Sequence, residues 1–279
     1  GRNMPFGIRE HAMAAICNGM TLSGLRAYGA GFLIFSDYAR GGIRLSAIME
    51  LPVMHIFTHD SIYVGEDGPT HQPIEQLVGL RSVPGMRVFR PCDANEVVEC
   101  WRSVMAQTHH PAAFALTRQN LPTLDRAKFA SAEGCARGAY TLSDCEGGAP
   151  DVLLIGSGSE VHLCVAAQEI LAKEGVRARV VSMPCTALFD AQDEAYRMGV
   201  LPNAVRARVT CEAASTIGWD RYAGLDGECV GMTSFGASAP AKDVAAHFGF
   251  TPERVADAAR RSLARVRGTV AAAHGGGAQ

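Results

Sequence analysis

The chain has 279 residues, with 26 Lys and Arg against 28 Asp and Glu, and 48% of its residues are hydrophobic. This length suggests two domains, and the apolar fraction is sufficient for buried cores. The balanced charge argues against a broad basic surface for nucleic acid. We expect no membrane span, because no apolar run reaches the roughly 18–20 residues that a span needs, and no signal peptide, because Arg2, Arg9 and Glu10 flank no apolar h-region.

Nine cysteines are scattered along the chain, and no Cys-x-x-Cys pair occurs among them. Such spacing fits neither a zinc site nor a disulfide framework. The odd number of cysteines and the length of the chain favour a reducing compartment, so we expect the protein to be cytoplasmic.

The first part of the chain alternates helical and strand patterns. The predicted elements, in order, are helices over about 8–22 and 37–49, a buried strand over 53–58, a polar loop over 59–73, a helix over 74–80, a strand over 86–89, a helix from an N-cap at Asp93 to about Met105, and a strand over 112–117. Strands that alternate with helices indicate a mostly parallel sheet.

A polar stretch without periodicity, residues 121–135, predicts a linker between two domains over 1–120 and 136–267. The second domain is expected to contain strands over 152–155, 177–182, 208–211 and 229–232, a helix over 160–173, and a closing helix over 252–266 with Thr251 as its N-cap. Residues 268–279 lack periodicity and are predicted to be a disordered tail. The predicted fold class is α/β, with mostly parallel sheets in two domains.

One short motif imitates a nucleotide-binding loop. Gly156-Ser157-Gly158-Ser159 follows a predicted strand and precedes a predicted helix, but Val161 stands where the Gly-x-Gly-x-x-Gly pattern has its last glycine. We therefore expect no nucleotide at this loop.

The loop over residues 59–73 is the most informative stretch. It follows a buried strand, and ligands of open parallel sheets bind beyond the carboxyl ends of strands. Its two histidines and several carboxylates suit hydroxyl and phosphate binding and proton transfer. A solvated polar loop with capping acids has the same composition, so composition alone leaves both interpretations open.

Three further features also admit both a structural and a functional interpretation. Glu10 lies near a helix start, where an acid complements the helix dipole. Phe32, Phe35 and Tyr38 recur every three residues, a spacing that core packing also produces. Arg118 follows a strand and suits either a phosphate or an ion pair.

Several stretches together resemble one enzyme family, the transketolases. They are Gly65-Glu66-Asp67-Gly68-Pro69-Thr70-His71-Gln72-Pro73 with His59-Asp60-Ser61 before it, Gly7-Ile8-Arg9-Glu10-His11, residues 32–40, Arg90-Pro91-Cys92-Asp93, Thr117-Arg118-Gln119-Asn120 and Val230-Gly231-Met232-Thr233-Ser234-Phe235-Gly236. The resemblance extends to about Val266. The related deoxyxylulose-phosphate synthases resemble the loop around residues 68–72 but typically carry arginine at the position of His59.

The resemblance implies a thiamine-diphosphate enzyme of the pentose phosphate pathway. It would transfer a two-carbon ketol group reversibly from a ketose phosphate to an aldose phosphate, through an enamine of the cofactor. Residues 1–120 would be part of a pyrimidine-binding domain, and residues 136–267 would be the C-terminal domain.

The resemblance also implies roles for single residues in cofactor binding. Glu10 would bond the aminopyrimidine ring and promote its reactive tautomer, and Phe32, Phe35 and Tyr38 would form the aromatic pocket of that ring. His71 would lie beside the cofactor and bond the C1 hydroxyl of the donor. Glu10 and His71 would therefore be the catalytic residues.

The substrate channel would contain three more residues of the family pattern. Arg118 would hold the distal phosphate of the sugar, and His59 would make a second phosphate contact. Asp67 would bond the hydroxyl next to the reacting carbonyl and so select the configuration of the sugar.

Transketolases also need a diphosphate-binding domain, and its Mg²⁺ motif, Gly-Asp-Gly followed by Asn, does not occur in this chain. We therefore expect no metal ligand here and place the Mg²⁺ ligands on that absent domain. The chain would be a truncated piece or a subunit of a split enzyme, and the abrupt start at Gly1 favours truncation. The full enzyme would be a homodimer or a pairing with a separate diphosphate-binding chain, and the isolated chain would be inactive.

Two alternatives stay open. One is a catalytically silent structural module, and the other is a related enzyme such as deoxyxylulose-phosphate synthase or dihydroxyacetone synthase. The presence of Glu10, His59, Asp67, His71 and Arg118 argues against the silent module.

Overall fold

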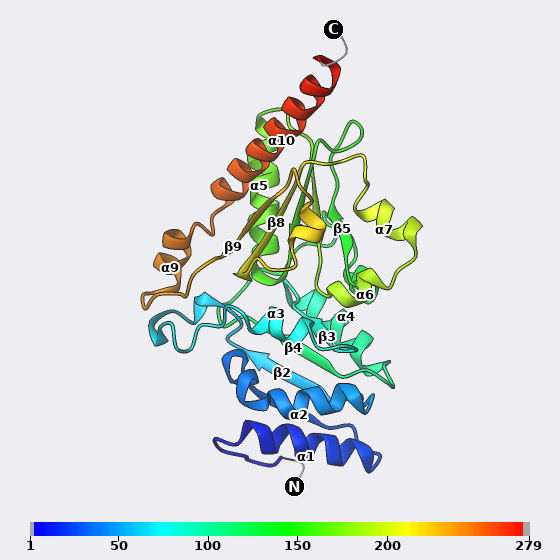
Figure 1. Ribbon diagram of the computed structural model, residues 1–279, viewed down its shortest axis with the longest axis vertical. Helices are drawn as coiled ribbons and strands as arrows, with labels where there is room; N and C mark the ends of the chain where they lie inside the picture. The colour runs from blue at the N-terminus through cyan, green and yellow to red at the C-terminus, as the bar shows by residue number, and fades with distance from the viewer. Residues whose placement is uncertain (1–2, 276–279) are drawn as a thin grey trace.

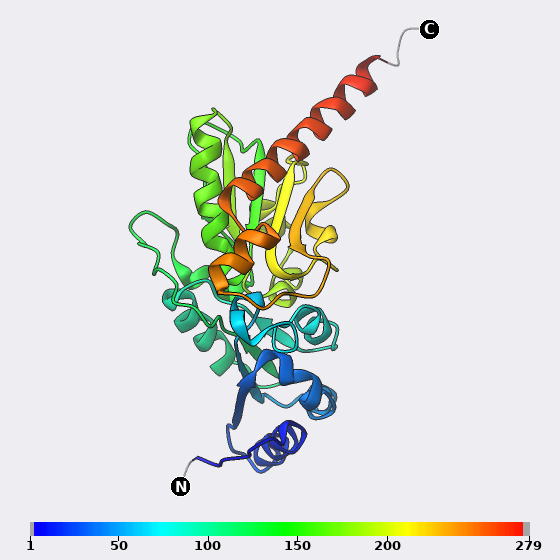
Figure 2. The same ribbon diagram turned by 90° about the vertical axis from the view of Figure 1, so that its left-hand side faces the viewer.

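The computed structural model describes residues 3–275. Two α/β units are stacked along the long axis, with the N-terminus at one end and helix α10 (Pro252–Gly275) reaching out at the other (Figure 1, Figure 2). Each unit is built around its own sheet, and β5 contributes the one antiparallel pairing among the described strands. The predicted α/β fold class with mostly parallel sheets is therefore confirmed.

The N-terminal unit contains a parallel sheet with the strand order β1-β2-β4-β3. Its strands are β1 (Tyr28–Phe32), β2 (Met54–Thr58), β3 (Arg87–Phe89) and β4 (Ala112–Ala115), and its helices are α1 (Glu10–Leu22), α2 (Ser36–Ile48), α3 (Gln76–Arg81) and α4 (Ala94–Met105). Helices α1 and α2 lie side by side at the N-terminal end of the molecule (Figure 1). The parallel strands bring their carboxyl ends to one edge of the sheet, which is where ligands of such sheets bind.

The C-terminal unit contains a sheet with the strand order β5-β7-β6-β8-β9. Its strands are β5 (Tyr140–Ser143), β6 (Val152–Gly156), β7 (Ala178–Ser182), β8 (Arg208–Ser215) and β9 (Glu228–Met232), and its helices besides α10 are α5 (Val161–Lys173), α6 (Thr186–Asp190), α7 (Glu194–Val200), α8 (Asp220–Ala223) and α9 (Ala241–Phe248). Side chains of a strand alternate between faces. Val152 and Leu154 of β6 accordingly pack with α5 and α10, whereas Leu153 and Ile155 pack with α6, α7 and α8.

Two predicted helix starts are confirmed by hydrogen bonds. The Glu96 amide donates to Asp93 Oδ1 over 2.8 Å, so Asp93 caps α4, and the Arg254 amide donates to Thr251 Oγ1 over 3.2 Å at the start of α10. Strand β1 has no counterpart in the prediction, because Gly29 and Gly31 interrupt its apolar pattern.

The chain from residue 268 to Gly275 differs from the prediction of a disordered tail, because α10 continues through it. Alanines at positions 271–273 favour a helix without any apolar periodicity, and periodicity was the signal behind the prediction. The rest of the predicted tail, residues 276–279, lies outside the described residues.

The apolar cores of the two units are continuous. Phe89 and Phe114 of the N-terminal sheet belong to the same buried cluster as Leu142 and Leu154 of the C-terminal sheet. Buried Glu96 of α4 adds a polar connection, because it accepts hydrogen bonds from Tyr140 of β5 over 2.8 Å and Ser182 of β7 over 2.6 Å. The two units therefore share one interior.

All nine cysteines are free thiols, and seven of them are buried. Within residues 3–275, no group of His, Cys, Asp or Glu side chains could hold a metal ion. Among these same residues, no helix has the length and apolarity required to cross a membrane.

Candidate functional site

A continuous chain of aromatic rings lies at the carboxyl edge of the N-terminal sheet. Phe32 ends β1, Phe35 ends the 3₁₀ helix η1 (Leu33–Phe35), and Tyr38 lies in the first turn of α2. The ring centroids of Phe32 and Phe35 are 6.0 Å apart with planes within 4°, and those of Phe35 and Tyr38 are also 6.0 Å apart. The spacing of three residues thus forms a stacked row at the sheet edge, with Phe32 and Phe35 half-buried and Tyr38 exposed.

His59 extends this row from the neighbouring strand. Phe32 pairs with Thr58 in the sheet, so the residue after Thr58 lies beside the Phe32 ring. The centroids of His59 and Phe32 are 3.7 Å apart, and Thr58 Oγ1 lies 2.9 Å from His59 Nδ1. The backbone of His59 has φ +58°, a left-handed conformation that His adopts more readily than most residues and that concentrates at functional sites.

The electrostatic surroundings of His59 identify two further neighbours. Burial lowers the pKa of His59, the Arg118 guanidinium lowers it further, and the carboxylates of Asp67 and Asp60 oppose both effects. Arg118 follows β4 and is exposed, and Asp67 ends the 3₁₀ helix η2 (Ile62–Asp67) and is also exposed. Arg118 and Asp67 therefore both lie close enough to His59 for their charges to act on its imidazole.

His71 approaches the row from the loop after η2. Its ring meets Phe35 edge-on, with centroids 5.7 Å apart and planes at 80°. Thr70 Oγ1 lies 2.9 Å from His71 Nδ1, which leaves Nε2 available for a ligand.

Glu10 is the first residue of α1 and is half-buried. Within the described part of the chain its carboxylate has no hydrogen-bond or ion-pair partner, so it can accept a bond from a ligand. The sequence predicts eight site residues. Seven of them are connected in the structure, either by ring contacts or by electrostatic interaction with His59. Glu10 makes neither kind of contact with the other seven among the described residues.

A buried charge network that the sequence did not indicate lies directly beneath the loop. Arg90 follows β3, is fully buried, and donates from Nε to Asp60 Oδ2 over 2.8 Å. Its Nη1 donates to the Ser157 carbonyl over 2.6 Å and also to Glu160. Asp60 immediately follows His59, so this network ties the predicted channel to the C-terminal unit.

The network continues into the C-terminal sheet through Glu212 of β8. Arg81 donates to both oxygens of Glu212 over 2.7 Å, and the Trp219 indole donates to it over 2.7 Å. Burial raises the pKa of Glu212, but Arg81 and Arg90 outweigh burial and hold the pKa at about 2. For Glu160, burial prevails over Arg90 and raises the pKa.

Arg90 also explains the loop that imitates a nucleotide-binding motif. A Cβ atom at Gly158 would lie 2.6 Å from Arg90 Cζ, so glycine is required for the close approach. The space at the end of β6 is thus filled by a guanidinium from the other unit.

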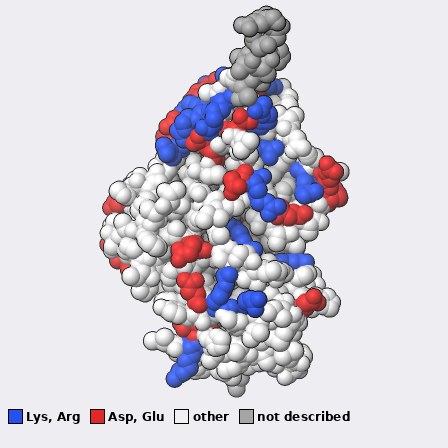
Figure 3. Space-filling view, in the orientation of Figure 1, with Lys and Arg blue, Asp and Glu red and all other residues white. Residues whose placement is uncertain are grey.

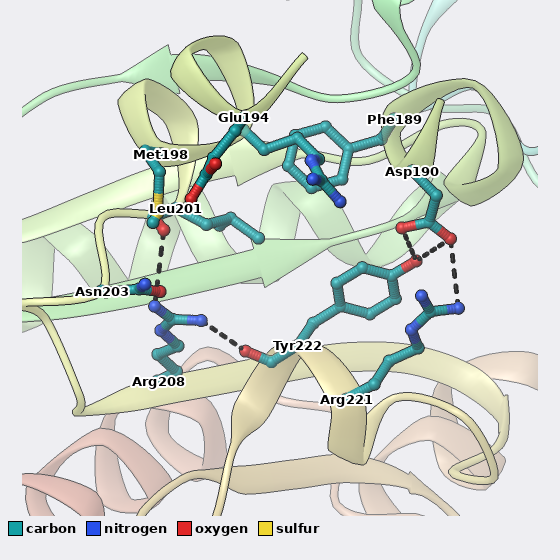
Figure 4. A pocket seen from close by; sticks show the side chains of 10 residues that line it. Phe189, Asp190, Glu194, Met198, Leu201, Asn203, Arg208, Arg221 and Tyr222 are labelled. Carbon is teal, nitrogen blue, oxygen red and sulfur yellow. Dashed lines mark hydrogen bonds and ion pairs between the residues drawn. The ribbon is translucent and has the colours of Figure 1, made fainter. Parts of the chain in front are cut away.

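A separate pocket of about 290 Å³ lies on the C-terminal unit between α6, α7 and α8 (Figure 4). Inside it Asp190 accepts from Tyr222 over 2.9 Å and pairs with Arg221 over 3.1 Å, and Arg208 donates to main-chain carbonyls such as that of Pro202. None of the residues singled out from the sequence lines this pocket.

Comparison with known proteins places both units in one family. The model described as "Transketolase, pyrimidine binding domain" matches residues 1–123, and the model described as "Transketolase-like TK C-terminal domain" matches residues 138–251. These two matches define the chain as a pyrimidine-binding unit joined to a C-terminal unit.

Curated relatives and solved structures agree with these matches. The transketolase of Halalkalibacterium halodurans is 50% identical over 94% of this chain, and that of Bacillus subtilis is 48% identical over 91%. The crystal structure of a Pichia stipitis transketolase complex with sedoheptulose 7-phosphate has a TM-score of 0.88 at 43% identity over 94% of this chain and 38% of its own. The chain belongs to the transketolase family. It spans 40% and 38% of the length of the two bacterial relatives.

Proposed function

We propose that this chain forms the pyrimidine-binding and C-terminal parts of a transketolase. The full enzyme would transfer a two-carbon ketol group from a ketose phosphate to an aldose phosphate. The proposal rests on the row of aromatic rings formed by Tyr38, Phe35, Phe32 and His59, called the ring row below. In it Phe32 stacks on His59, and Phe35 meets His71 edge-on. This row connects the residues proposed for the cofactor with those proposed for the substrate.

The proposed cofactor is thiamine diphosphate, and the residues present suit its pyrimidine ring. Phe35 and Tyr38 offer aromatic faces, on which a flat ring stacks with a gain of about 0.5–1.5 kcal/mol beyond burial. Glu10 offers a carboxylate without a partner among the described residues, which can bond a ring nitrogen and favour one protonation state. When bound, the cofactor supplies a carbon nucleophile and an electron sink for the transferred group.

The proposed substrates are sugar phosphates, and the Pichia stipitis relative was solved with sedoheptulose 7-phosphate. Arg118 and His59 suit the phosphate, because a guanidinium binds phosphate oxygens with two parallel hydrogen bonds. Asp67 would accept from a sugar hydroxyl, and His71, with its Nδ1 beside Thr70, would donate or accept at the reacting end.

We further propose that the N-terminal end is covered in the active enzyme by a diphosphate-binding region that carries the Mg²⁺ ligands. Large apolar side chains are exposed there on α1, α2 and the edge strand β1, namely Ile16, Leu22, Tyr28, Leu45 and Ile48. On the face that Figure 3 shows, few charged side chains lie over this end. Apolar surface of this kind is typical of an interface. The covering region would come from a longer chain or a separate subunit, and the enzyme would be a cytoplasmic dimer of the pentose phosphate pathway.

The test is a chimera in which this chain replaces the matching segment of the Bacillus subtilis transketolase. We expect the chimera to convert xylulose 5-phosphate and ribose 5-phosphate in the presence of thiamine diphosphate and Mg²⁺. The isolated chain should give no turnover in the same assay. A folded chimera that binds thiamine diphosphate without turnover would contradict the proposed function.

A further inference from the structure

The substrate loop, residues 59–73, is covered by a segment of the C-terminal unit. This segment, residues 233–241, runs from the end of β9 to the first residue of α9, and a Cβ atom at Gly65 of η2 would lie 3.3 Å from the Ala239 carbonyl oxygen (Figure 1). Ser238 Oγ donates to the Glu66 carbonyl over 2.7 Å, so a side chain of the segment bonds directly to the loop.

Gln72 makes the main connection between the loop and the segment. Its Nε2 donates to the Gly65 carbonyl over 2.9 Å, within the loop, and to the Ala237 carbonyl over 3.0 Å, within the segment. The side chain is 1% exposed, and its Oε1 has no partner in the part of the chain that the structure describes. Both amide hydrogens are therefore used to join two backbones, and they fix the carboxamide orientation.

The segment approaches Gln72 too closely for any side chain at Gly236. A Cβ atom at Gly236 would overlap Gln72 Oε1 and lie 3.3 Å from Ile62 Cγ2. Gln72 is buried among these groups, so an added methyl would have to displace its carboxamide. Gly236 is thus the residue that permits the Gln72 contact.

These contacts enclose the two residues of the loop with proposed ligand roles. Asp67 lies between Gly65 and Gln72 in the chain, and His71 directly precedes Gln72. Beyond η2, the Gly68 amide donates to the Gly65 carbonyl over 3.1 Å and the His71 amide to the Gly68 carbonyl over 3.0 Å. The bonds through Gln72 and Ser238 add external support to this stretch.

We propose that the C-terminal unit positions Asp67 and His71 for sugar binding through Gln72, with Gly236 and Ser238 as the supporting residues of segment 233–241. Gln72 acts here as a positioning residue, because it contacts backbone rather than substrate. The inference rests on the proposed transketolase function, and it gives the C-terminal unit a role in sugar selectivity.

The first measurement is hydrogen–deuterium exchange on this chain alone, which requires no activity. Gln72→Met keeps the length of the side chain and removes both donated bonds, and Gly236→Ala displaces the carboxamide. We expect amides over 62–72 to exchange at least about tenfold faster in both variants, the scale of one or two net hydrogen bonds. Amides of α4 should not change.

Matched controls separate this effect from general loosening. Gly199→Ala adds a methyl in α7 where nothing lies within 4 Å, and Ser234→Ala removes a hydroxyl that bonds only the adjacent Phe235 carbonyl. Both should leave exchange over 62–72 unchanged. Ser238→Ala removes one exposed hydroxyl, so it keeps the test valid even where Gly236→Ala does not fold.

The second measurement uses the chimera and compares kcat/KM for xylulose 5-phosphate with that for its C3 epimer, ribulose 5-phosphate. A positioning role predicts that Gln72→Met and Ser238→Ala lower this ratio, by about tenfold for Gln72→Met, whereas mere loss of folded enzyme would lower both values equally. Unchanged exchange over 62–72 and an unchanged ratio would overturn the inference. An unmodified chimera that folds and binds thiamine diphosphate without turnover would contradict the proposed function, while the exchange result would still decide the positioning contact.

Discussion

The imidazole of His59 stacks on the ring of Phe32 with centroids 3.7 Å apart and planes 20° from parallel. The contact exists because Phe32 and Thr58 pair at the ends of neighbouring parallel strands. Phe35 contacts Phe32 in turn, and Tyr38 contacts Phe35, each with ring centroids 6.0 Å apart. A change in the ring row will therefore affect the side chain proposed to contact the phosphate.

Replacing Glu10 with Gln should reduce kcat of the chimera by about 10²-fold or more, the usual scale for acid–base catalysis. The amide keeps the shape but loses the charge that favours the reactive protonation state of the cofactor. Cofactor affinity, measured by titration, should weaken only modestly. Glu146→Gln, at an exposed position in a distant loop, is the control. Unchanged kcat in Glu10→Gln would disprove the proposed role.

Replacing Arg118 with Ala should reduce kcat/KM for xylulose 5-phosphate by about 10- to 150-fold, because a hydrogen bond to a charged group contributes about 1.5–3 kcal/mol. The effect should be mostly on KM, and hydroxypyruvate, which carries no phosphate, should be nearly unaffected. Arg197→Ala, another exposed arginine, is the control. Equal losses for both donors would indicate that Arg118 supports the fold instead.

Replacing Arg90 with Met should lower the free energy of unfolding by about 3–5 kcal/mol, because Asp60 and Glu160 would remain buried without their cation. Arg102→Met, which removes an exposed partner of Glu99 on α4, should change stability little. The measurement is urea unfolding of both variants. A loss of less than about 1 kcal/mol in Arg90→Met would contradict this prediction. It would mean that Asp60 and Glu160 do not stay buried and charged without the guanidinium.

Stability should fall as the pH falls from about 6.5 towards 4. His55 of β2 is fully buried, and burial lowers its pKa from 6.5 to about 4. The unfolded chain therefore binds a proton in this range before the folded chain does, which costs about 3 kcal/mol of stability when complete. Urea unfolding at pH 7.5 and pH 4.5 should reveal a smaller difference in His55→Gln than in His109→Gln, a variant at an exposed position. The same difference in both variants would assign the acid sensitivity to other groups.

The sequence predicted best what depends on local pattern. Val152, Leu153, Leu154 and Ile155 form an uninterrupted apolar run, and that run is strand β6. The aromatic spacing and the loop motif identified the site in the same way, although sequence alone did not place Phe32 against His59. Strand β1 was not predicted, because only one of its five residues is buried and two are glycines, so it lacks the apolar pattern of a strand.

The Arg90 network could not be predicted from pattern, because its partners are far apart in the chain. Arg90 bonds Asp60 on one side and Glu160 on the other, and only the packed units bring them together. An arginine after a strand is ordinarily expected at the surface. Its complete burial depends on the charges that the other unit supplies.

The shared interior also determines how the chain can be divided. Glu96 receives bonds from two strands of the other unit, and Asp93 pairs with Arg126 of the linker over 2.8 Å. Cutting the gene between the units would divide the buried cluster that contains Phe89 and Phe114 of one unit and Leu142 of the other, so neither product would retain a complete core. The two units should therefore unfold in a single cooperative transition. A chimera with a related protein should exchange both units together.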